Sequence, residues 1–315
     1  MEIFYMISII VPNYNHYNFL PQRLDTIFNQ TFQDFEVILL DDCSTDGSWD
    51  YLKTFENHPK VSHCIRNETN SGSPFKQWQK GMELAKYEWI WIAESDDFSD
   101  LCFLEKNFEF LEDSVSIVFC KSKEVDQFGQ PYFGFMKPFF HEEIKILEAS
   151  FSLKGKTFIR QYLIYSNYLK NASSVIFKKP KEFPSKILDM KYSGDWFFWI
   201  FLLKEDDYII YLNQDLNFFR CHFNTTRVFI NHHNELLKKV ENFSCINFAY
   251  TIIGLQYLPS IDFFRYKEDV QYYFNTIHRL GRFRMKAIFP KIPFWLYPIY
   301  YSIFFKSLIS KKFID

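Results

Sequence analysis

The sequence lacks several features that mark other classes of protein. Only nine of its 315 residues are glycine, and the turn after the first apolar run, PNYNHYN, contains none. This absence argues against a nucleotidyltransferase with a glycine-rich phosphate loop. The six cysteines form no C-x-x-C pair and no zinc-ligand spacing, so we expect free thiols in a reducing compartment. The formal net charge of −2 argues against a nucleic-acid-binding surface.

Long apolar runs are also missing. No stretch of about twenty apolar residues is present, so we expect no membrane-spanning helix. The N-terminal MEIFYMISIIVP has no basic region before a longer apolar one, so we expect a first strand rather than a signal peptide. These absences favour a cytoplasmic protein.

Two acidic clusters each follow a short apolar run. Asp41 and Asp42 come after FEVILL, and Asp96 and Asp97 come after WIWIAES. Such runs predict buried parallel strands, and carboxylates directly after them lie at the C-terminal edge of an α/β sheet, where open sheets bind ligands. Gathered carboxylates need a cation, or the hydroxyls and N–H groups of a sugar or base. The pattern therefore predicts a metal-assisted nucleotide site.

Apolar periodicity predicts strands that alternate with helices over the first 120 residues. Strands are expected at 7–11, 35–40, 61–65, 87–93 and 115–120, and helices at 20–28, capped by Asn18, and at 74–85. This alternation implies an α/β fold with a mostly parallel sheet and right-handed crossovers.

The pattern changes after residue 121. Residues 127–156 lack periodicity and are expected to form a loop over the site. Further helices are expected near 157–166, 196–203, 228–254 and 262–280, and further strands at 173–177, 208–212 and 216–220. One catalytic domain, residues 1–227, with a helical extension over 228–315 fits this order.

The tail 286–313 is dense in aromatic residues and flanked by lysines. Three prolines and Lys291 argue against a spanning helix. Two interpretations stay open for it: an interfacial segment at the membrane surface, and a tail packed on the body of the protein or on a partner.

Six stretches between residues 7 and 227 carry a resemblance to a known family. They are ISIIVPNYN (7–15), QTFQDFEVILLDDCSTDGS (30–48), RNETNSG (66–72), WIAESDD (91–97), SGDWFFWI (193–200) and FFRCHFNTTR (218–227). In this order they resemble the family-2 glycosyltransferases, whose α/β fold, called GT-A, binds nucleotide-sugars. The resemblance implies inverting transfer of a sugar from a nucleotide donor, UDP-linked by preference, to a hydroxyl of a glycan or lipid-linked acceptor in surface polysaccharide synthesis.

The resemblance also implies which residues bind the nucleotide. The turn after the first strand would lie against base and ribose through Pro12, Asn13, Tyr14 and Asn15, although Asn13 and Asn15 can equally shape the turn. One of Asp41 and Asp42 would accept from the uracil N–H, and we assign Asp42. Asp46 is expected only to cap the turn before the next helix.

Further donor contacts follow from the later stretches. Asn70 and Gly72 match a loop near the nucleotide, and Lys76 is a candidate for the diphosphate, or else a solvated lysine. Arg220 is suited to a bidentate diphosphate contact.

The aspartate pair and a histidine are the expected metal ligands. The resemblance assigns Mg²⁺ or Mn²⁺ to Asp97, ribose or metal to Asp96, and metal or phosphate to His222. The cation would neutralise the leaving UDP. Many relatives carry aspartate where this chain has Glu94, so the role of Glu94 is open. The remaining histidines are expected at the surface.

Asp195 matches the acidic residue that the family uses as general base, which would deprotonate the acceptor hydroxyl. Gly194 stands where most relatives carry glutamate, and Asp195 can also be read as the N-cap of the helix that follows. A catalytically silent sugar-nucleotide-binding or scaffold protein is the alternative. The presence of Asp195, Asp96 and Asp97 argues against it.

Overall fold

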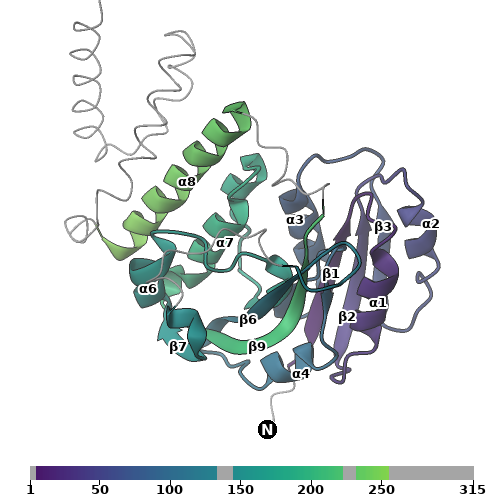
Figure 1. The fold of residues 1–315 in the computed structure, drawn as a ribbon, viewed down its shortest axis with the longest axis horizontal. Coiled ribbons are helices and arrows are strands. Elements are labelled where there is room, and N and C mark those ends of the chain that lie inside the picture. Colours follow the sequence, from purple (N-terminus) through teal and green to yellow (C-terminus); the bar gives the residue numbers. More distant parts are fainter. Residues whose placement is uncertain (1–4, 133–144, 223–231, 255–315) are drawn as a thin grey trace, which may run out of the picture.

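The computed structural model describes residues 5–132, 145–222 and 232–254 (Figure 1). Within them, a nine-stranded mixed sheet has the order β3-β2-β1-β4-β8-β6-β9-β5, and β7 pairs with β9. The strands are β1 (Ile7–Asn13), β2 (Phe35–Asp41), β3 (Val61–Arg66), β4 (Trp89–Ile92), β5 (Phe98–Ser99), β6 (Val115–Val125), β7 (Phe151–Lys154), β8 (Val175–Lys178) and β9 (Tyr208–Arg220).

The helices lie between these strands and after them. The α-helices are α1 (Leu20–Phe28), α2 (Ser48–Lys53), α3 (Pro74–Leu84), α4 (Phe103–Phe108), α6 (Gly155–Phe158), α7 (Gly194–Leu202) and α8 (His232–Ile253). Shorter 3₁₀ or π turns are η1 (Lys145–Glu148), η2 (Ile159–Leu163), η3 (Ala172–Ser174), η4 (Ser185–Asp189) and η5 (Leu203–Glu205). Among the described residues, no helix is both long enough and apolar enough to cross a membrane.

The N-terminal half of the sheet is parallel, as the sequence predicts. β1 pairs in parallel with β2 and β4, and β2 pairs in parallel with β3. Every residue of β1 and β2 is buried, because helices cover both faces of the sheet and leave neither to water. The register sets Asn13 beside Asp41, so the loops after β1 and β2 begin at the same edge. The loop after β4 begins there as well.

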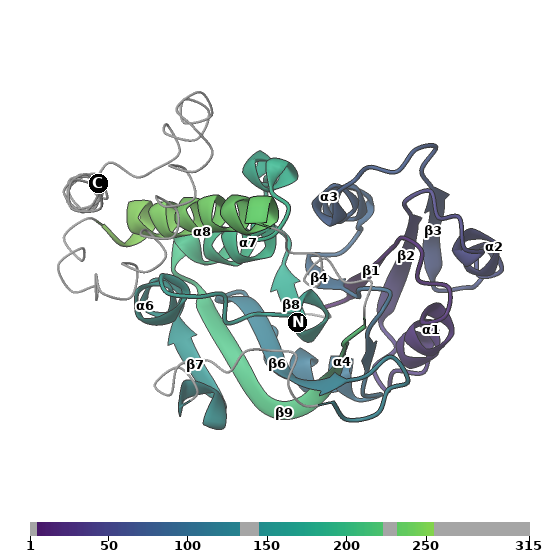
Figure 2. The same cartoon turned by 45° about the horizontal axis from the view of Figure 1, so that its top comes forward.

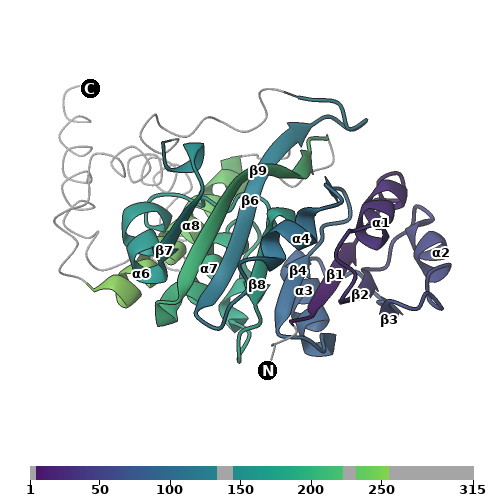
Figure 3. The same cartoon turned by 90° about the horizontal axis from the view of Figure 1, so that it is seen from below.

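The C-terminal half is mixed. β8 is antiparallel to both β4 and β6, whereas β6 and β9 run side by side in parallel (Figure 3). β9 is one strand from Tyr208 to Arg220, so the expectation of two strands was wrong. The register of the β6–β9 pairing shifts near Lys121, and β9 continues past this irregularity as one strand. The antiparallel pairing of Phe98 with Phe218 brings Arg220, at the end of β9, to the loop after β4.

Two hydrophobic cores lie on opposite faces of the sheet. Along β1, Ile10 packs with α3, α7 and α8, whereas Ile9 and Val11 pack with α1 and α4. Figure 2 shows α3, α7 and α8 on one side of the sheet and α1 and α4 on the other. The alternation of side chains along a strand therefore supplies both layers from one apolar run.

Some sequence-based boundaries need correction. α1 has Phe19 at its N-cap position, with no side-chain cap, so the assignment of Asn18 was wrong; Pro21 in the first turn favours a start there. The predicted helix 157–166 is short α6 followed by π-helical η2. The segment expected as a loop contains β7, whose four residues are too few to show periodicity. Residues 133–144, 262–280 and 286–313, with their predicted loop, helix and tail, lie outside the described residues.

Candidate active site

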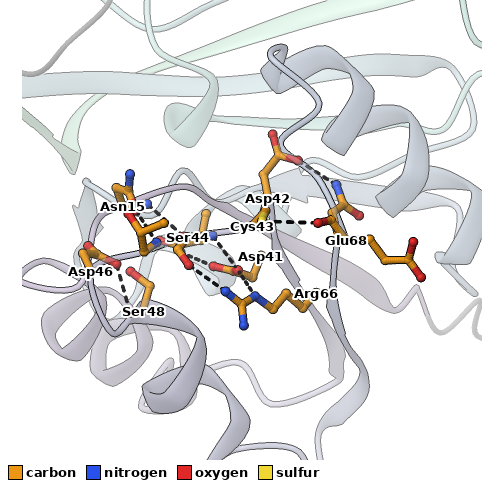
Figure 4. A network of polar contacts seen from close by, with 12 residues as sticks. Asn15, Asp41, Asp42, Cys43, Ser44, Asp46, Ser48, Arg66 and Glu68 are labelled. Atoms are coloured by element: carbon orange, nitrogen blue, oxygen red, sulfur yellow. Dashed lines mark hydrogen bonds and ion pairs between the residues drawn. The ribbon is translucent and has the colours of Figure 1, made fainter.

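The loop after β2 is built around the buried carboxylate of Asp41. Asp41 accepts hydrogen bonds from Asn13 Nδ2 (2.9 Å) and the Ser44 amide (2.9 Å), and Arg66 Nε lies 3.5 Å away (Figure 4). Asp46, further along the loop, accepts from the amides of Ser48 and Tyr17. The prediction that Asp46 shapes the turn before α2 is therefore confirmed.

Asp42 binds a different part of the chain. Its Oδ1 accepts from Asn67 Nδ2 (2.7 Å), the Ser71 amide (2.9 Å) and Gln77 Nε2 (2.9 Å), and its Oδ2 accepts from Ser71 Oγ (2.7 Å). Four donors come close to the capacity of one carboxylate. Asp42 therefore anchors the loop before α3, and its contact with a uracil N–H stays a prediction.

The turn after Pro12, which pairs with Leu40 at the end of β1, is fixed by its two asparagines. Asn13 is buried beside Asp41, and Asn15, in the left-handed region at φ 57°, accepts from the Thr45 amide at 2.8 Å. The Tyr14 side chain, which is 46% exposed, is left on the surface of the turn. Both asparagines thus shape the turn, and base stacking by Tyr14 stays a prediction.

The loop before α3 is held in a similar way. Asn70 Oδ1 accepts from the Gly72 amide at 2.6 Å, and Gly72 has φ +69°, a conformation that glycine adopts without strain. Lys76 Nζ donates to the carbonyl of Ser71 at 3.0 Å, and Ser71 in turn bonds Asp42. The loop is therefore ordered next to Asp42, and a diphosphate contact by Lys76 stays a prediction.

The two aspartates after β4 have different surroundings. Asp97 is 1% exposed and accepts from Asn171 Nδ2 (2.9 Å), Ser173 Oγ (2.7 Å) and the Arg220 amide (3.0 Å). Burial, together with the charge of Asp96, raises the pKa of Asp97. Asp97 therefore joins the loop after β4, residues 93–97 and from here on the acidic loop, to η3 and to the end of β9. Its predicted metal contact has to compete with these donors.

Asp96 instead faces two histidines. Its Oδ2 lies 3.0 Å from His222 Nε2, and the ligand atoms of His16, Asp96 and His222 all lie within 4.8 Å of one another. Burial alone would raise the pKa of Asp96, but His16 and the hydrogen bond with His222 lower it below its usual range. His16 Nδ1 is 2.8 Å from Ser95 Oγ. His16, expected at the surface, is partly buried and belongs to this group.

One feature of the sequence pointed to His16 as a site residue, but residue spacing alone could not identify its partner. His16 directly follows the stretch 7–15, which the resemblance places beside the donor, but its partner His222 is distant along the chain. Two imidazoles and one carboxylate make a donor set that suits a first-row divalent cation. The residues therefore fit a divalent metal, held by Asp96, His222 and His16.

Glu94, whose role the sequence left open, hydrogen-bonds to α3 and η3 and does not join this donor set. Its Oε1 accepts from Trp78 Nε1 at 2.9 Å, and its amide donates to Ser173 Oγ at 3.1 Å. Burial, and then the charge of Asp96, raises the pKa of Glu94 to about 8. Glu94 is thus fixed by α3 and η3 and is not among the grouped ligand atoms.

Arg220 is held inside the protein beside Asp96. Its guanidinium lies 4.6 Å from the ring centre of Phe19 and 5.1 Å from that of Phe98. It donates to the carbonyl of Asp96 and to the side-chain oxygen of Gln22. Arg220 therefore braces the acidic loop against α1, and its diphosphate contact stays a prediction.

Asp195 stands in the first turn of α7, where Ser193 occupies the N-cap position, so the N-cap interpretation of Asp195 was wrong. Its Oδ2 accepts from Asn167 Nδ2 at 2.9 Å. Four residues further on, Asn171 bonds Asp97. The segment 167–171 therefore connects the candidate base with the acidic loop.

α8 supports the same turn. Glu241 accepts from the amides of Lys191 (2.8 Å), Tyr192 (2.7 Å) and Ser193 (2.9 Å). The glutamate is buried, and these bonds satisfy backbone donors just before α7. Nothing in the local sequence indicated this role, because Glu241 reaches α7 only through the packing of α8.

Position 194 carries glycine, where most relatives carry glutamate, for a steric reason. A Cβ built on Gly194 would lie 2.5 Å from Phe75 Cε2 and 2.6 Å from Cζ. α3, which carries Phe75, also carries Gln77, a partner of Asp42. The start of α7 thus lies against the helix that holds the Asp42 loop, and this contact leaves no room for a side chain at 194.

A small cavity of about 90 Å³ lies between α7, α8 and the turn after η2. Its walls contain Trp196, next to Asp195, and Ser166, next to Asn167. The other residues around it are Tyr165, Lys239, Asn242, Phe243 and Ile246. Polar and aromatic groups therefore meet close to the candidate base.

The mixed, mostly parallel sheet with helices on both faces is that of a GT-A-type glycosyltransferase. Residues 8–165 match the family described as glycosyl transferase family 2. The chain belongs to this family.

The curated proteins that the chain resembles are named as glycosyltransferases. The chain is 26% identical over 211 residues to the poly(ribitol-phosphate) beta-glucosyltransferase of Bacillus spizizenii, covering 64% of this chain and 32% of the relative. It is 33% identical over 129 residues to the poly(ribitol-phosphate) beta-N-acetylglucosaminyltransferase TarS of Staphylococcus aureus, covering 39% and 22%. The chain thus spans half or less of the first curated relatives that it matches.

Solved structures share the fold. Residues 1–349 of S. aureus TarS in complex with UDP give a TM-score of 0.54 at 16% identity, covering 95% of this chain and 86% of that one. The mannosyltransferase PcManGT of Pyrobaculum calidifontis, in complex with GDP-Man and Mn²⁺, gives 0.52 at 17% identity, covering 76% and 63%. The predicted GT-A-like fold is confirmed.

Proposed function

We propose that the protein is an inverting glycosyltransferase. It transfers a sugar from a UDP-sugar to a hydroxyl of a glycan or lipid-linked acceptor in the synthesis of a surface polysaccharide. The observation that carries the proposal is the grouping of His16, Asp96 and His222 at the same sheet edge as the Asp41 and Asp42 loop. A ligand set at this edge is where an open α/β sheet receives a nucleotide diphosphate.

The metal in this proposal is Mn²⁺ rather than Mg²⁺. Mg²⁺ prefers oxygen ligands and keeps several waters, whereas imidazole nitrogens suit transition metals. When bound, the cation would neutralise charge on the leaving diphosphate. Asp96, His222 and His16 would hold it, and the Asp97 carboxylate would keep the loop in place through Asn171, Ser173 and the Arg220 amide.

The donor proposal favours UDP. A carboxylate that accepts from the imide N–H of uracil would distinguish it from other bases, and Asp41 and Asp42 are the candidates on the loop after β2. Structures of TarS with UDP and with UDP-GlcNAc, which share the fold, are consistent with this choice. Tyr14, exposed on the neighbouring turn, is the proposed stacking surface for the base.

The chemical step in this proposal uses Asp195. Its carboxylate takes the proton of the acceptor hydroxyl as the oxygen attacks the anomeric carbon opposite the leaving diphosphate, which inverts the configuration. General-base help of this kind contributes about 10²–10⁴ in rate. Asn167 orients the carboxylate, and Glu241 fixes the turn that carries it. The cavity beside Trp196 would take part of the acceptor.

The test is turnover of UDP-sugars with Mn²⁺. The Asp195→Asn variant should lose nearly all transfer while its thermal shift with UDP and Mn²⁺ stays that of the wild type, because ligand that binds the native state raises its apparent stability. Asp189→Asn, at an exposed position six residues earlier, is the matched control. Full activity in Asp195→Asn excludes Asp195 as base. No turnover in the wild type with any nucleotide-sugar favours the silent binding protein.

The proposed location is the cytoplasmic face of the membrane, with the tail 286–313 in contact with lipid or with a partner. Deleting residues 286–315 tests the tail. Membrane-fraction recovery should fall if the tail contacts lipid, and it should stay unchanged if the tail packs elsewhere.

A further inference from the structure

Arg23, on α1, is a buried cation whose guanidinium forms no hydrogen bond with the described part of the chain. Its side chain is 0% exposed, and its Nε, Nη1 and Nη2 atoms have no partner among the described residues. A guanidinium carries five N–H donors, and burying an unpaired charge is costly. Such a group needs a compensating interaction or a function.

The surroundings of Arg23 supply the compensation. Its guanidinium stacks over the ring of Trp91 in β4, 4.8 Å from the ring centre. Of the negative charges that act on it, that of Asp97 is the strongest, followed by those of Asp96 and Glu94. Burial lowers the pKa of Arg23 only to about 10, so the side chain keeps its charge at neutral pH.

The acidic loop is therefore charge-compensated without a metal. Both of its aspartates, Asp96 and Asp97, attract the two buried guanidinium groups of Arg23 and Arg220. Arg220 is hydrogen-bonded to the loop, whereas no ion pair fixes Arg23 to it. Arg23 acts on the loop through space, and charges act over longer distances in the interior than in water.

We infer that Arg23 is a positioning residue that serves as a fixed counter-charge to the aspartates after β4 and weakens the affinity of their site for a divalent cation. A cation that reaches the site meets the fixed positive charges of Arg23 and Arg220, which already offset those aspartates. This inference depends on the proposed metal-dependent function.

Removing the positive charge of Arg23 should tighten Mn²⁺ binding, whether or not nucleotide is bound. Interior Coulomb interactions are large enough for a change of at least about tenfold.

The experiment is calorimetric titration of Mn²⁺, with and without UDP, into wild type, Arg23→Met and Arg23→Lys. In the wild type, UDP should lower the Kd of Mn²⁺ by about tenfold or more. Arg23→Met should bind Mn²⁺ at least about tenfold more tightly than wild type, both alone and with UDP. Arg23→Lys keeps the charge and should resemble the wild type.

The outcomes separate the two proposals. If the wild type binds no Mn²⁺ even with UDP, the proposed metal site fails. If the wild type binds Mn²⁺ and Arg23→Met binds it with unchanged affinity, Arg23 is only a core residue stacked on Trp91. Should Arg23→Met not fold, Arg23→Gln takes its place.

Discussion

His222 Nε2 lies 3.0 Å from Asp96 Oδ2, although 126 residues separate the two along the chain. The contact exists because β5, directly after Asp97, pairs with the end of β9, which stops two residues before His222. His16 joins them from the loop after β1. The grouping therefore depends on the order of strands in the sheet.

The first prediction concerns these histidines. His222→Ala should weaken Mn²⁺ binding in the presence of UDP by roughly 100-fold, because losing even a supporting contact of a metal site costs 10–100-fold. His16→Ala should weaken it by about tenfold or more for the same reason. Isothermal titration measures both.

His63→Ala is the control for the histidine variants, since His63 lies in β3, away from the cluster. Unchanged Mn²⁺ affinity in His222→Ala would remove His222 from the ligand set. Unchanged affinity in His16→Ala alone would leave a two-residue site.

The second prediction separates Asp96 from Asp97. Asp96→Asn should lose Mn²⁺ binding at nearly wild-type stability, because few protein donors depend on its carboxylate. Asp97→Ala should lower the free energy of unfolding by about 3 kcal/mol or more, because three buried donors lose their acceptor. Urea denaturation and Mn²⁺ titration of both variants provide the measurement. Wild-type stability with lost Mn²⁺ binding in Asp97→Ala would restore the metal contact that the sequence assigned to Asp97.

The third prediction follows from the contact between Gly194 and Phe75. Gly194→Ala should destabilise the protein by about 1–3 kcal/mol, because its Cβ would overlap the Phe75 ring. Residues in contact have non-additive effects, so the double variant Gly194→Ala with Phe75→Leu should cost less than the sum of the two single variants. Thermal unfolding of the four proteins measures the coupling. Strict additivity would mean that the overlap is relieved elsewhere.

The fourth prediction concerns Asp46 and pH. Burial alone would raise the pKa of Asp46, but hydrogen bonds from Ser48 and the Tyr17 amide outweigh it, so the pKa is lowered in the folded protein. The unfolded state then binds more protons at acid pH. The stability that Asp46 contributes is complete above its unfolded pKa, about 4, and is lost as pH falls through the folded pKa.

Asp46→Asn keeps one acceptor oxygen but removes the charge, so it should cost less than about 1 kcal/mol at pH 7 and progressively less as pH falls below about 4. Denaturant unfolding at pH 7, 5, 4 and 3 measures the difference between the two proteins. Asp189→Asn, at an exposed position, should show no such trend. A constant difference at all pH values would contradict the lowered pKa.

Local patterns were sufficient to predict one half of the fold. β1, β2 and α3 follow apolar runs that are continuous or periodic in the chain, and their ends agree with the predicted ends within two residues. β7 and the continuity of β9 were missed. A four-residue edge strand and a strand crossing the polar residues Asn213 to Asp215 are specified by their pairing partners rather than by their own composition.

The sequence by itself determined that carboxylates follow β2 and β4, because an apolar run and the residue after it are neighbours whatever the rest of the chain does. It also determined the family, through motifs that are each only a few residues long. Only the tertiary structure decided that Asp96 faces His16 and His222 while Asp97 faces Asn171 and Ser173. The reason is that strand pairing and burial choose the partner of each polar group, and those partners come from remote segments.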